Sequence, residues 1–255
     1  MDLRFAGIDR LYGTGSVARL ATCHVAVVGL GGVGSWAAEA LARSGVGTIT
    51  LIDADDVCVS NTNRQSHAME GEFGRTKVSV IAQRLQAINP NIVVHPVAQF
   101  VTLKNLAELL DNGFSAVIDG CDALRIKVEM IAFCKRRKIP IVVSGSAGGR
   151  ADPTLITARD LTRTEHDILL GLVRRRLRAD FGWTRNPKRY FGVQAVFSRE
   201  NVNYPQADGS VCKTRAPDAE TGLKLDCGGG LGAATHVTAT FGMVAASRVI
   251  ERLLE

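Results

Sequence analysis

The 255 residues suffice for one large α/β domain, or for one domain with an elaboration, and for a substantial buried core. The composition, 46% hydrophobic and 22% charged, is typical of a soluble globular protein, and the net charge of +6 permits a polyanionic partner without proving one. The six cysteines include no CxxC pair, which argues against a structural zinc knuckle. Because no secretory signal pattern is recognisable, we expect a cytoplasmic chain with reduced thiols.

The first part of the chain alternates strand and helix patterns. Residues 1–20 predict a helical N-terminal arm, because their apolar side chains recur at roughly helical spacing. Residues 21–150 contain apolar runs that predict strands at 25–28, 49–52, 92–94, 116–118 and 139–144. Helices are predicted between them, the later ones at 74–89, 103–110 and 123–137. This alternation predicts a Rossmann-like α/β fold with a doubly wound, mainly parallel sheet.

The regular alternation stops after Gly145, and the last third of the chain has a different character. Residues 151–255 predict a basic crossover segment, short strands at 192–198 and 211–214, and a closing helix. We expect these parts to form an antiparallel or crossover elaboration within the same globular unit.

The stretch 231–250 is apolar enough to suggest a membrane span. It also contains three threonines, His236 and Arg248, together with many small residues. We interpret it as a helix packed inside the domain; integral membrane insertion is not expected, and membrane association is left open.

A glycine-rich turn follows the first predicted strand, and an acid ends the second. The turn contains four glycines, namely Gly29, Gly31, Gly32 and Gly34. Glycine lets a backbone turn tightly and approach a polyphosphate, and the following helix offers unpaired N–H groups to the anion. Asp53 lies about twenty residues beyond the turn, where an acid can bind a ribose hydroxyl. Together these features predict a nucleotide site.

Charged residues after the strands indicate which nucleotide is bound. Arg64, Arg75 and Lys77 follow the second strand closely, and Asp122 follows the fourth. Cations and a magnesium-binding carboxylate at a triphosphate serve phosphoryl or nucleotidyl transfer, whereas a dinucleotide enzyme needs neither. The P-loop pattern GxxxxGK[ST] is absent, which excludes a P-loop ATPase.

The acids at the strand ends are expected to share one rim. Ligands of doubly wound sheets bind beyond the carboxyl ends of the strands, so Asp53, Asp119 and Asp122 are predicted to lie beside the glycine turn. For Asp119 a second interpretation stays open, in which the carboxylate only caps the next helix.

Ordered motifs in residues 20–145 resemble the ubiquitin-activating-enzyme-like superfamily, whose bacterial members adenylate carboxylates in molybdopterin and thiamine synthesis. The motifs are GLGGVGS, DxDDVxxSNTNRQ, the helix carrying Lys77, and VIDGCD. Further motifs extend the resemblance over nearly the whole chain to the tRNA threonylcarbamoyladenosine dehydratase family: RLYG, a DFG in the basic segment, VFSRE with YPQADGSVC, and DCGGGLGAATHVTATFG.

The resemblance implies an ATP-dependent, ligase-type enzyme that modifies tRNA and acts as a homodimer. The carboxylate of the threonylcarbamoyl group next to the anticodon would be adenylated, and the side chain's carbamoyl group would then expel AMP and close a ring. Because the attacking group is tethered beside the activated acyl group, proximity supplies much of the rate and no cysteine nucleophile is essential. ATP and Mg²⁺ are the implied cofactors, and a monovalent cation is left open.

The resemblance also implies roles for individual residues. Arg64, Lys77 and Asp122 would be catalytic, with Asp122 holding Mg²⁺. The ATP-binding set would comprise Gly29, Gly31, Gly32, Gly34, Ser35, Asp53, Asp55, Asn61 and Gln65.

The sequence departs from the family at Gly7, where many relatives carry an arginine that reaches ATP in the partner subunit. Arg4 and Arg10 lie nearby, and Arg10 could replace it. Of the cysteines in the region where protein-modifier activators carry a nucleophile, Cys227 is the one to test, although structural packing is favoured.

Two more residues receive structural interpretations. Cys121, which lies between the two acids of VIDGCD, is interpreted as a small buried residue, not as a nucleophile. His236 is interpreted as a satisfied core histidine.

The basic segment, residues 159–190, predicts contact with tRNA phosphates. The alternative is a charged helix exposed to solvent that binds no ligand. Trp183, Tyr190 and Phe191 are interleaved with the charge and could stack on unpaired anticodon-loop bases. The predicted tRNA-binding residues are Arg174, Arg175, Arg176, Arg178, Arg185, Lys188 and Arg189.

Two other functions are alternatives for a chain with this nucleotide site. A sulfur-carrier adenylyltransferase would activate the C-terminal Gly-Gly of a small protein and usually holds zinc through CxxC pairs, which this chain lacks. An adaptor for a cysteine desulfurase or sulfur-acceptor protein would bind nucleotide only as a structural ligand, and the phosphate-facing cations argue against a pure scaffold.

Overall fold

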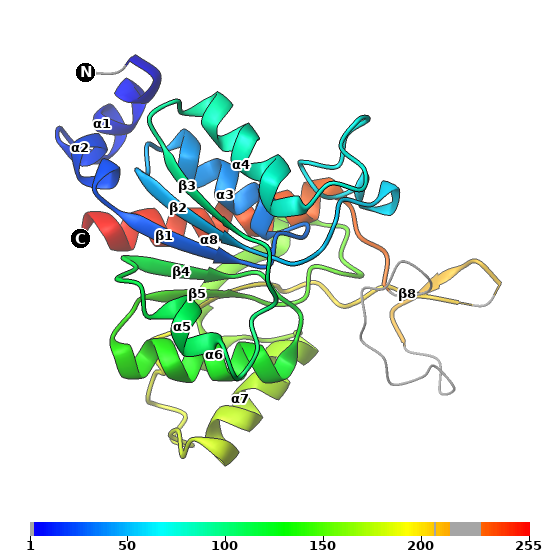
Figure 1. Ribbon diagram of the computed structural model, residues 1–255. Coiled ribbons are helices and arrows are strands. Elements are labelled where there is room, and N and C mark those ends of the chain that lie inside the picture. Colours follow the sequence, from blue (N-terminus) through cyan, green and yellow to red (C-terminus); the bar gives the residue numbers. More distant parts are fainter. Residues whose placement is uncertain (1–2, 207, 215–230) are drawn as a thin grey trace.

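The computed structural model describes residues 3–206, 208–214 and 231–255 and contains a seven-stranded sheet in the order β3-β2-β1-β4-β5-β7-β6 (Figure 1). Every neighbouring pair is parallel except β6 and β7. The strands are β1 His24–Val28, β2 Thr48–Ile52, β3 Val93–Val97, β4 Ala116–Asp119, β5 Ile141–Ser144, β6 Ile156–Asp160 and β7 Gln194–Ser198. The doubly wound, mainly parallel α/β fold is therefore confirmed.

Helices cover both faces of the sheet because successive strand residues are apolar on both sides. Val25 and Val27 belong to one buried cluster, whereas Ala26 and Val28 belong to the other. The first cluster includes side chains of α3 (Gly34–Arg43), α4 (Lys77–Ile88) and α8 (Thr235–Leu254). The second includes side chains of α5 (Leu106–Leu110), α6 (Leu124–Arg137) and α7 (Ile168–Asp180).

The remaining elements are short. The predicted helical arm consists of a 3₁₀ turn at Leu3–Phe5, α1 (Ala6–Tyr12) and α2 (Ser16–Ala21). Three more 3₁₀ turns and a two-stranded ribbon complete the described chain: Val59–Asn61, Pro153–Leu155, Leu161–Arg163, β8 Tyr204–Pro205 and β9 Val211–Cys212.

The structure corrects the interpretation that strand–helix alternation stops after Gly145. The basic segment contains α7, whose apolar side chains Leu170, Val173 and Leu177 are fully buried in the second core cluster, where α7 packs beside α6. After α7 the chain forms β7, which lies parallel to β5 and extends the parallel sheet. β6, which precedes α7 in the chain, pairs antiparallel with β7 and forms the edge of the sheet. The many arginines masked this helical apolar stripe.

Helix α8 packs inside the fold, as predicted for the apolar stretch 231–250. It lies directly on α3, where a Cβ at Gly242 would come within 2.5 Å of the Val33 carbonyl oxygen, so a larger residue would push the helices apart. Phe241 and Ala245 are fully buried. Within the described chain, no helix has the length and apolar character needed to cross a membrane.

Candidate functional site

A cavity of about 680 Å³ lies at the carboxyl ends of β1, β2 and β4, which point to the right in Figure 1. Nine of the twelve predicted catalytic and ATP-binding residues line it: Gly29, Gly31, Asp53, Asp55, Asn61, Arg64, Gln65, Lys77 and Asp122. Val28, Ile52, Phe100 and Ile126 add apolar wall. Gly32, Gly34 and Ser35 do not line the cavity; they lie in the turn and at the start of α3.

The glycines of the turn serve different purposes. Gly29 has a φ of +82°, and a Cβ there would come within 2.9 Å of the Cys121 backbone nitrogen. At Gly34 a Cβ would lie 1.9 Å from the Gly29 carbonyl oxygen, so only glycine lets α3 begin directly against the end of β1. Gly32 abuts Thr238 of α8. A Cβ at Gly31 would meet no atom within 4 Å, which leaves backbone accessible to a ligand at the cavity.

Asp53 holds the shape of the glycine turn. Its Oδ2 accepts a 2.6 Å hydrogen bond from the Leu30 amide, and its Oδ1 accepts one of 2.8 Å from the Asp55 amide. The side chain is buried at the cavity wall. Each carboxylate oxygen has a second lone pair. Asp53 can therefore order the turn and still accept a hydrogen bond from a ligand.

Lys77 supplies a buried positive charge at the first turn of α4. Its Nζ lies 2.8 Å from Asp55 Oδ2, and its side chain is 7% exposed, whereas that of Asp55 is 52% exposed. The ion pair holds the ammonium at the cavity wall in a fixed position. An anion in the cavity would meet a charge that is already desolvated.

Arg64 lines the cavity, but Arg75 does not. The Arg64 guanidinium donates to the Ser60 carbonyl at 2.8 Å and to Asn63 Oδ1 at 2.9 Å. Arg75 instead pairs with Glu72 and donates to Gln83 Oε1. The prediction of three cations aimed at phosphate is therefore wrong for Arg75, because acceptors nearby in sequence hold its side chain elsewhere.

Two amides complete this wall. Asn61 Oδ1 accepts from the Cys58 amide at 3.1 Å and fixes the 3₁₀ turn. Gln65 is buried, and its Oε1 has no hydrogen-bond partner within the described chain. A buried acceptor without a donor is costly, so this amide suits a bound polar ligand or water. Ser35, by contrast, accepts weakly from the Ser66 amide at 3.4 Å, behind the cavity.

Asp122 faces the cavity just beyond β4. Desolvation raises the pKa of its carboxyl group; Lys127 opposes the shift, while Asp119 and Asp167 add to it. Across the described ranges no group of three or more acid, histidine or cysteine side chains could hold a metal ion by itself. Mg²⁺ binds through one or two carboxylates plus substrate phosphates, so a single Asp122 at a phosphate site fits that ion.

Asp119 does not face the cavity but forms a buried ion pair that the sequence analysis missed. Its Oδ2 lies 2.7 Å from Lys127 Nζ of α6, and both side chains are fully buried. Its Oδ1 accepts from the Cys121 amide at 3.1 Å and from the Cys121 thiol at 2.9 Å. Asp119 therefore has a structural role, but not the predicted one: within the described chain no side chain caps the start of α6, and Asp119 instead pairs with Lys127.

This pair also explains the state of its neighbours. Burial alone would lower the pKa of Lys127, but Asp119 raises it on balance, so the ammonium keeps its proton. Burial and the charge of Asp119 raise the pKa of Cys121, so its thiol is no activated nucleophile, as interpreted. Cys121 is not fully buried, however: it is half-buried and lines the cavity. One sequence signal for Lys127 existed: it shares a helical face with Met130, Ile131 and Cys134, which are all buried.

A second group beside Asp122 was also missed. Asp167, the N-cap of α7, accepts from the Leu170 and Ser146 amides at 2.8 Å each. Burial raises its pKa. Arg150 is buried nearby and donates to the His166 carbonyl, with its Nε and Nη1 lacking partners among the described residues. Their loop positions carry no periodic signal.

The predicted tRNA-binding arginines fall into two groups. Arg174 is half-buried and donates to Thr164 Oγ1, Arg176 pairs with Asp180 at 2.6 Å, and Arg178 donates to the Thr184 carbonyl. The other four predicted residues are exposed and have no side-chain partner among the described residues: Arg175, Arg185, Lys188 and Arg189. Arg176 is exposed as well, despite its ion pair.

The three aromatic side chains between residues 183 and 191 also differ in how far they are exposed. Trp183 and Phe191 pack edge to face with ring centroids 4.8 Å apart, and Phe191 is buried. The expectation that Phe191 stacks on RNA bases is therefore wrong. Tyr190 is 65% exposed and lies under the Arg163 guanidinium, 4.8 Å from it.

The remaining predicted residues lie at the surface or outside the described ranges. His236 is satisfied by the Ala151 carbonyl at 3.0 Å, but it is exposed and so not a core residue. Gly7 lies on α1 beside Arg10, whose Nη2 would be 3.9 Å from a Cβ at that position. Cys227 lies outside the described residues.

Comparisons with known proteins agree with this geometry. The ThiF family matches residues 6–254. The tRNA threonylcarbamoyladenosine dehydratase of Escherichia coli is 51% identical over 98% of this chain and 93% of its own length. The crystal structure of that enzyme with ATP superposes with a TM-score of 0.86, at 47% identity over 98% of this chain and 93% of the other.

A molybdopterin-synthase adenylyltransferase of Salmonella typhimurium is more distant, with 34% identity over 55% of this chain and 56% of its own length. The two matches to the tRNA threonylcarbamoyladenosine dehydratase cover 98% of this chain and so include the segment after Gly145. The chain therefore belongs to the ThiF family and, within it, to the tRNA threonylcarbamoyladenosine dehydratases.

Proposed function

We propose that this protein uses ATP to cyclise the threonylcarbamoyl side chain of threonylcarbamoyladenosine in tRNA. The observation that carries the proposal is the cavity in which the glycine turn, Lys77 and Asp122 meet, in a chain 51% identical to a tRNA threonylcarbamoyladenosine dehydratase over nearly its whole length. The relative's crystal structure with ATP supports ATP as the nucleotide.

The reaction has two steps. A carboxylate oxygen of the threonylcarbamoyl group attacks the α-phosphorus of ATP, which forms an acyl-adenylate and releases pyrophosphate. The carbamoyl group of the same side chain then attacks the acyl carbon, loses a proton and expels AMP. One water is lost overall, its oxygen remaining on AMP. The tether between the reacting groups makes the second step intramolecular and fast.

The residues of the cavity position and neutralise the triphosphate. The open backbone at Gly31 and the start of α3 would bind phosphate through N–H groups. Lys77 and Arg64 would offset the charge that develops on the leaving pyrophosphate. Asp53 would bind the ribose, and Gln65 Oε1 is free to accept from the nucleotide. Asp55 and Asn61 hold this machinery in place.

Mg²⁺ and further partners belong to the same proposal. Asp122 would hold Mg²⁺, which would neutralise phosphate charge when bound. No residue is assigned to a monovalent cation. We also propose that the enzyme is a cytoplasmic homodimer of ligase type; a cysteine desulfurase or sulfur-acceptor protein is a further candidate partner. The division into an arm (1–20), a core (21–150) and a segment (151–255) within one unit stays a prediction.

The alternative, activation of a sulfur-carrier protein, is less well supported. Its representatives match only about half of this chain. The adaptor function does not explain why a buried, charged Lys77 lines the cavity.

Mass spectrometry of nucleosides tests the proposal. Threonylcarbamoylated tRNA incubated with the protein and Mg-ATP should lose one water per modified nucleoside, and Asp122→Ala should abolish the loss while its circular dichroism spectrum stays unchanged. Retained activity of Asp122→Ala with magnesium would remove the metal assignment. An unchanged nucleoside mass, together with pyrophosphate release on a carrier protein, would overturn the dehydratase function.

A further inference from the structure

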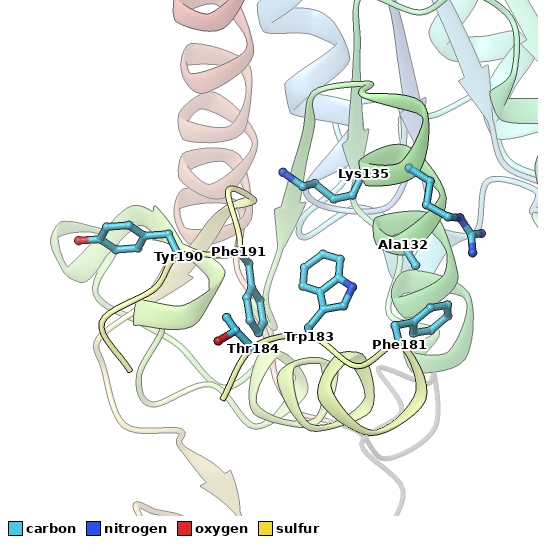
Figure 2. A pocket seen from close by; sticks show the side chains of 8 residues that line it. Ala132, Lys135, Phe181, Trp183, Thr184, Tyr190 and Phe191 are labelled. Atoms are coloured by element: carbon cyan, nitrogen blue, oxygen red, sulfur yellow. The ribbon is translucent and has the colours of Figure 1, made fainter. Parts of the chain in front are cut away.

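A second pocket lies between the end of α6 and the segment 181–191, away from the ATP cavity. Its volume is about 470 Å³, within the roughly 300–1,000 Å³ typical of small-ligand sites. Its lining residues are Ala132, Lys135, Arg136, Phe181, Trp183, Thr184, Tyr190 and Phe191. Figure 2 shows the Trp183 indole at the centre, with Phe191 beside it and Lys135 above.

The aromatic rings are fixed in place. Trp183 meets Phe191 edge to face, and the guanidinium carbon of Arg178 lies 5.5 Å from the centroid of the Phe191 ring. Tyr190 points away from Trp183 and extends the aromatic surface outward (Figure 2). Rings held in place by packing lose little freedom when a planar ligand stacks on them.

The charged side chains that line the pocket, Lys135 and Arg136, are both positive, while the Asp160 carboxylate lies beside the pocket and accepts from the Phe191 amide at 3.1 Å. Residues 132–140 contain four lysines or arginines, and residues 181–191 contain three; neither segment contains an acid. Arg137 pairs with Asp111. Lys135 donates to the Gly192 carbonyl at 3.2 Å. The other five are exposed and have no side-chain partner among the described residues: Arg136, Lys138, Arg185, Lys188 and Arg189. Unpaired cations around an aromatic pocket suit a ligand that has both a planar ring and a negative charge.

The pocket and the ATP cavity lie at opposite ends of one helix. Asp122 immediately precedes α6, whereas Lys135 and Arg136 lie on its last turn, and 14 residues of α-helix span about 20 Å. A small-molecule substrate could not contact both places. An RNA whose modified nucleotide occupies the cavity extends far enough to reach both.

We propose that this pocket binds an unpaired nucleotide of the RNA substrate, with the base against Trp183 and its phosphates near Lys135 and Arg136. The proposal rests on the proposed function, because it takes the RNA as the substrate. An acidic peptide would use the cations but not the ring, and an anionic lipid surface would not need a pocket. Base stacking combined with phosphate contact uses both features.

Binding of an unmodified anticodon stem-loop transcript, without ATP, tests the pocket separately from catalysis. Trp183→Leu should weaken binding about tenfold, the loss expected for one stacked base. Lys135→Gln with Arg136→Gln should weaken it and lower the slope of log K against log salt by about 0.7 per lost phosphate contact. Tyr12→Leu and the pair Arg19→Gln with Arg43→Gln are matched controls on α1, α2 and α3, and should bind as wild type.

Ultraviolet crosslinking locates the contact. A crosslink from the transcript to a peptide containing Trp183 or Tyr190 supports the pocket. Tyr190→Ala tests it without disturbing the core, because Tyr190 is 65% exposed. Crosslinks only outside 181–191, or equal losses in the controls, overturn it. So would equally tight binding of free UMP, or of vesicles containing phosphatidylserine, since the site would then not select RNA.

These outcomes are distinguishable from failure of the proposed function. If the pocket variants lose transcript binding but wild-type protein never removes water from modified tRNA, the pocket stands and the dehydratase function falls. If the enzyme removes water and the variants bind the transcript normally, the reverse holds.

Discussion

The two ends of α6 treat charge in opposite ways. At its start, the cavity cations have partners that hold them: Lys77 pairs with Asp55, and Arg64 donates to the Ser60 carbonyl. At its end, the cations around Trp183 are exposed, and several have no partner in the described chain. The first arrangement fixes charges where a reaction needs them, whereas the second supplies charge density that any phosphate chain can use.

The largest expected effect concerns the buried ion pair that joins α6 to the end of β4. Lys127→Met would leave the Asp119 carboxylate buried without its partner, at a cost of about 3–5 kcal/mol in the free energy of unfolding. Urea denaturation measures it. Lys135→Met on the exposed end of the same helix should change stability by less than about 0.5 kcal/mol. Adding Asp119→Leu should recover part of the loss; an unstable single variant that stays equally unstable in the double would contradict the ion-pair explanation.

The next effect separates the two cations near the start of α4. Lys77→Ala should lower kcat about 10²–10³-fold, because a positioned charge is lost at the cavity. Arg75→Ala should leave kcat within about twofold, since Arg75 pairs with Glu72 outside the lining. Pyrophosphate release measures both. Equal losses would mean that Arg75 swings into the cavity during the reaction.

Acid tests the packing near Lys77 through His67, which is fully buried and does not line the cavity. Burial, with the charges of Lys77 and Arg84, lowers the pKa of His67 to about 4, whereas an unfolded histidine has a pKa near 6.5. As the pH falls from 6.5 to 4, the unfolded state gains a proton that the folded state refuses, so stability drops by about 3 kcal/mol. His67→Gln should flatten this window in chemical denaturation, measured as a difference from wild type; an unchanged profile would assign the acid sensitivity to other groups.

The smallest effect distinguishes arginines within α7. Arg175→Gln should reduce the salt slope of tRNA binding by about 0.7–0.9, because its side chain is exposed and unpaired in the described structure. Arg174→Gln should leave the slope unchanged and lower the melting temperature, since Arg174 is half-buried against Thr164. A salt slope that falls with Arg174 but not with Arg175 would reverse this assignment.

Most residues of the ATP cavity could be predicted from local sequence patterns. The glycine turn, Asp53 and Lys77 could be placed because each follows or begins a periodic element, and the ends of parallel strands necessarily meet at one edge. Sequence patterns failed where charged residues obscured the buried face, as in α7, which has as many arginines as buried apolar residues, four of each.

The sequence by itself therefore determined the parallel α/β fold, the nucleotide edge and the acids and cations that surround it, because backbone periodicity and turn chemistry are local. Only the tertiary structure decided which way the polar side chains face. Asp119 pairs with Lys127, Phe191 is buried in the core, and residues about fifty positions apart line a pocket beside α6. These outcomes depend on partners supplied by other elements, and no spacing along the chain encodes which partner a flexible side chain will meet.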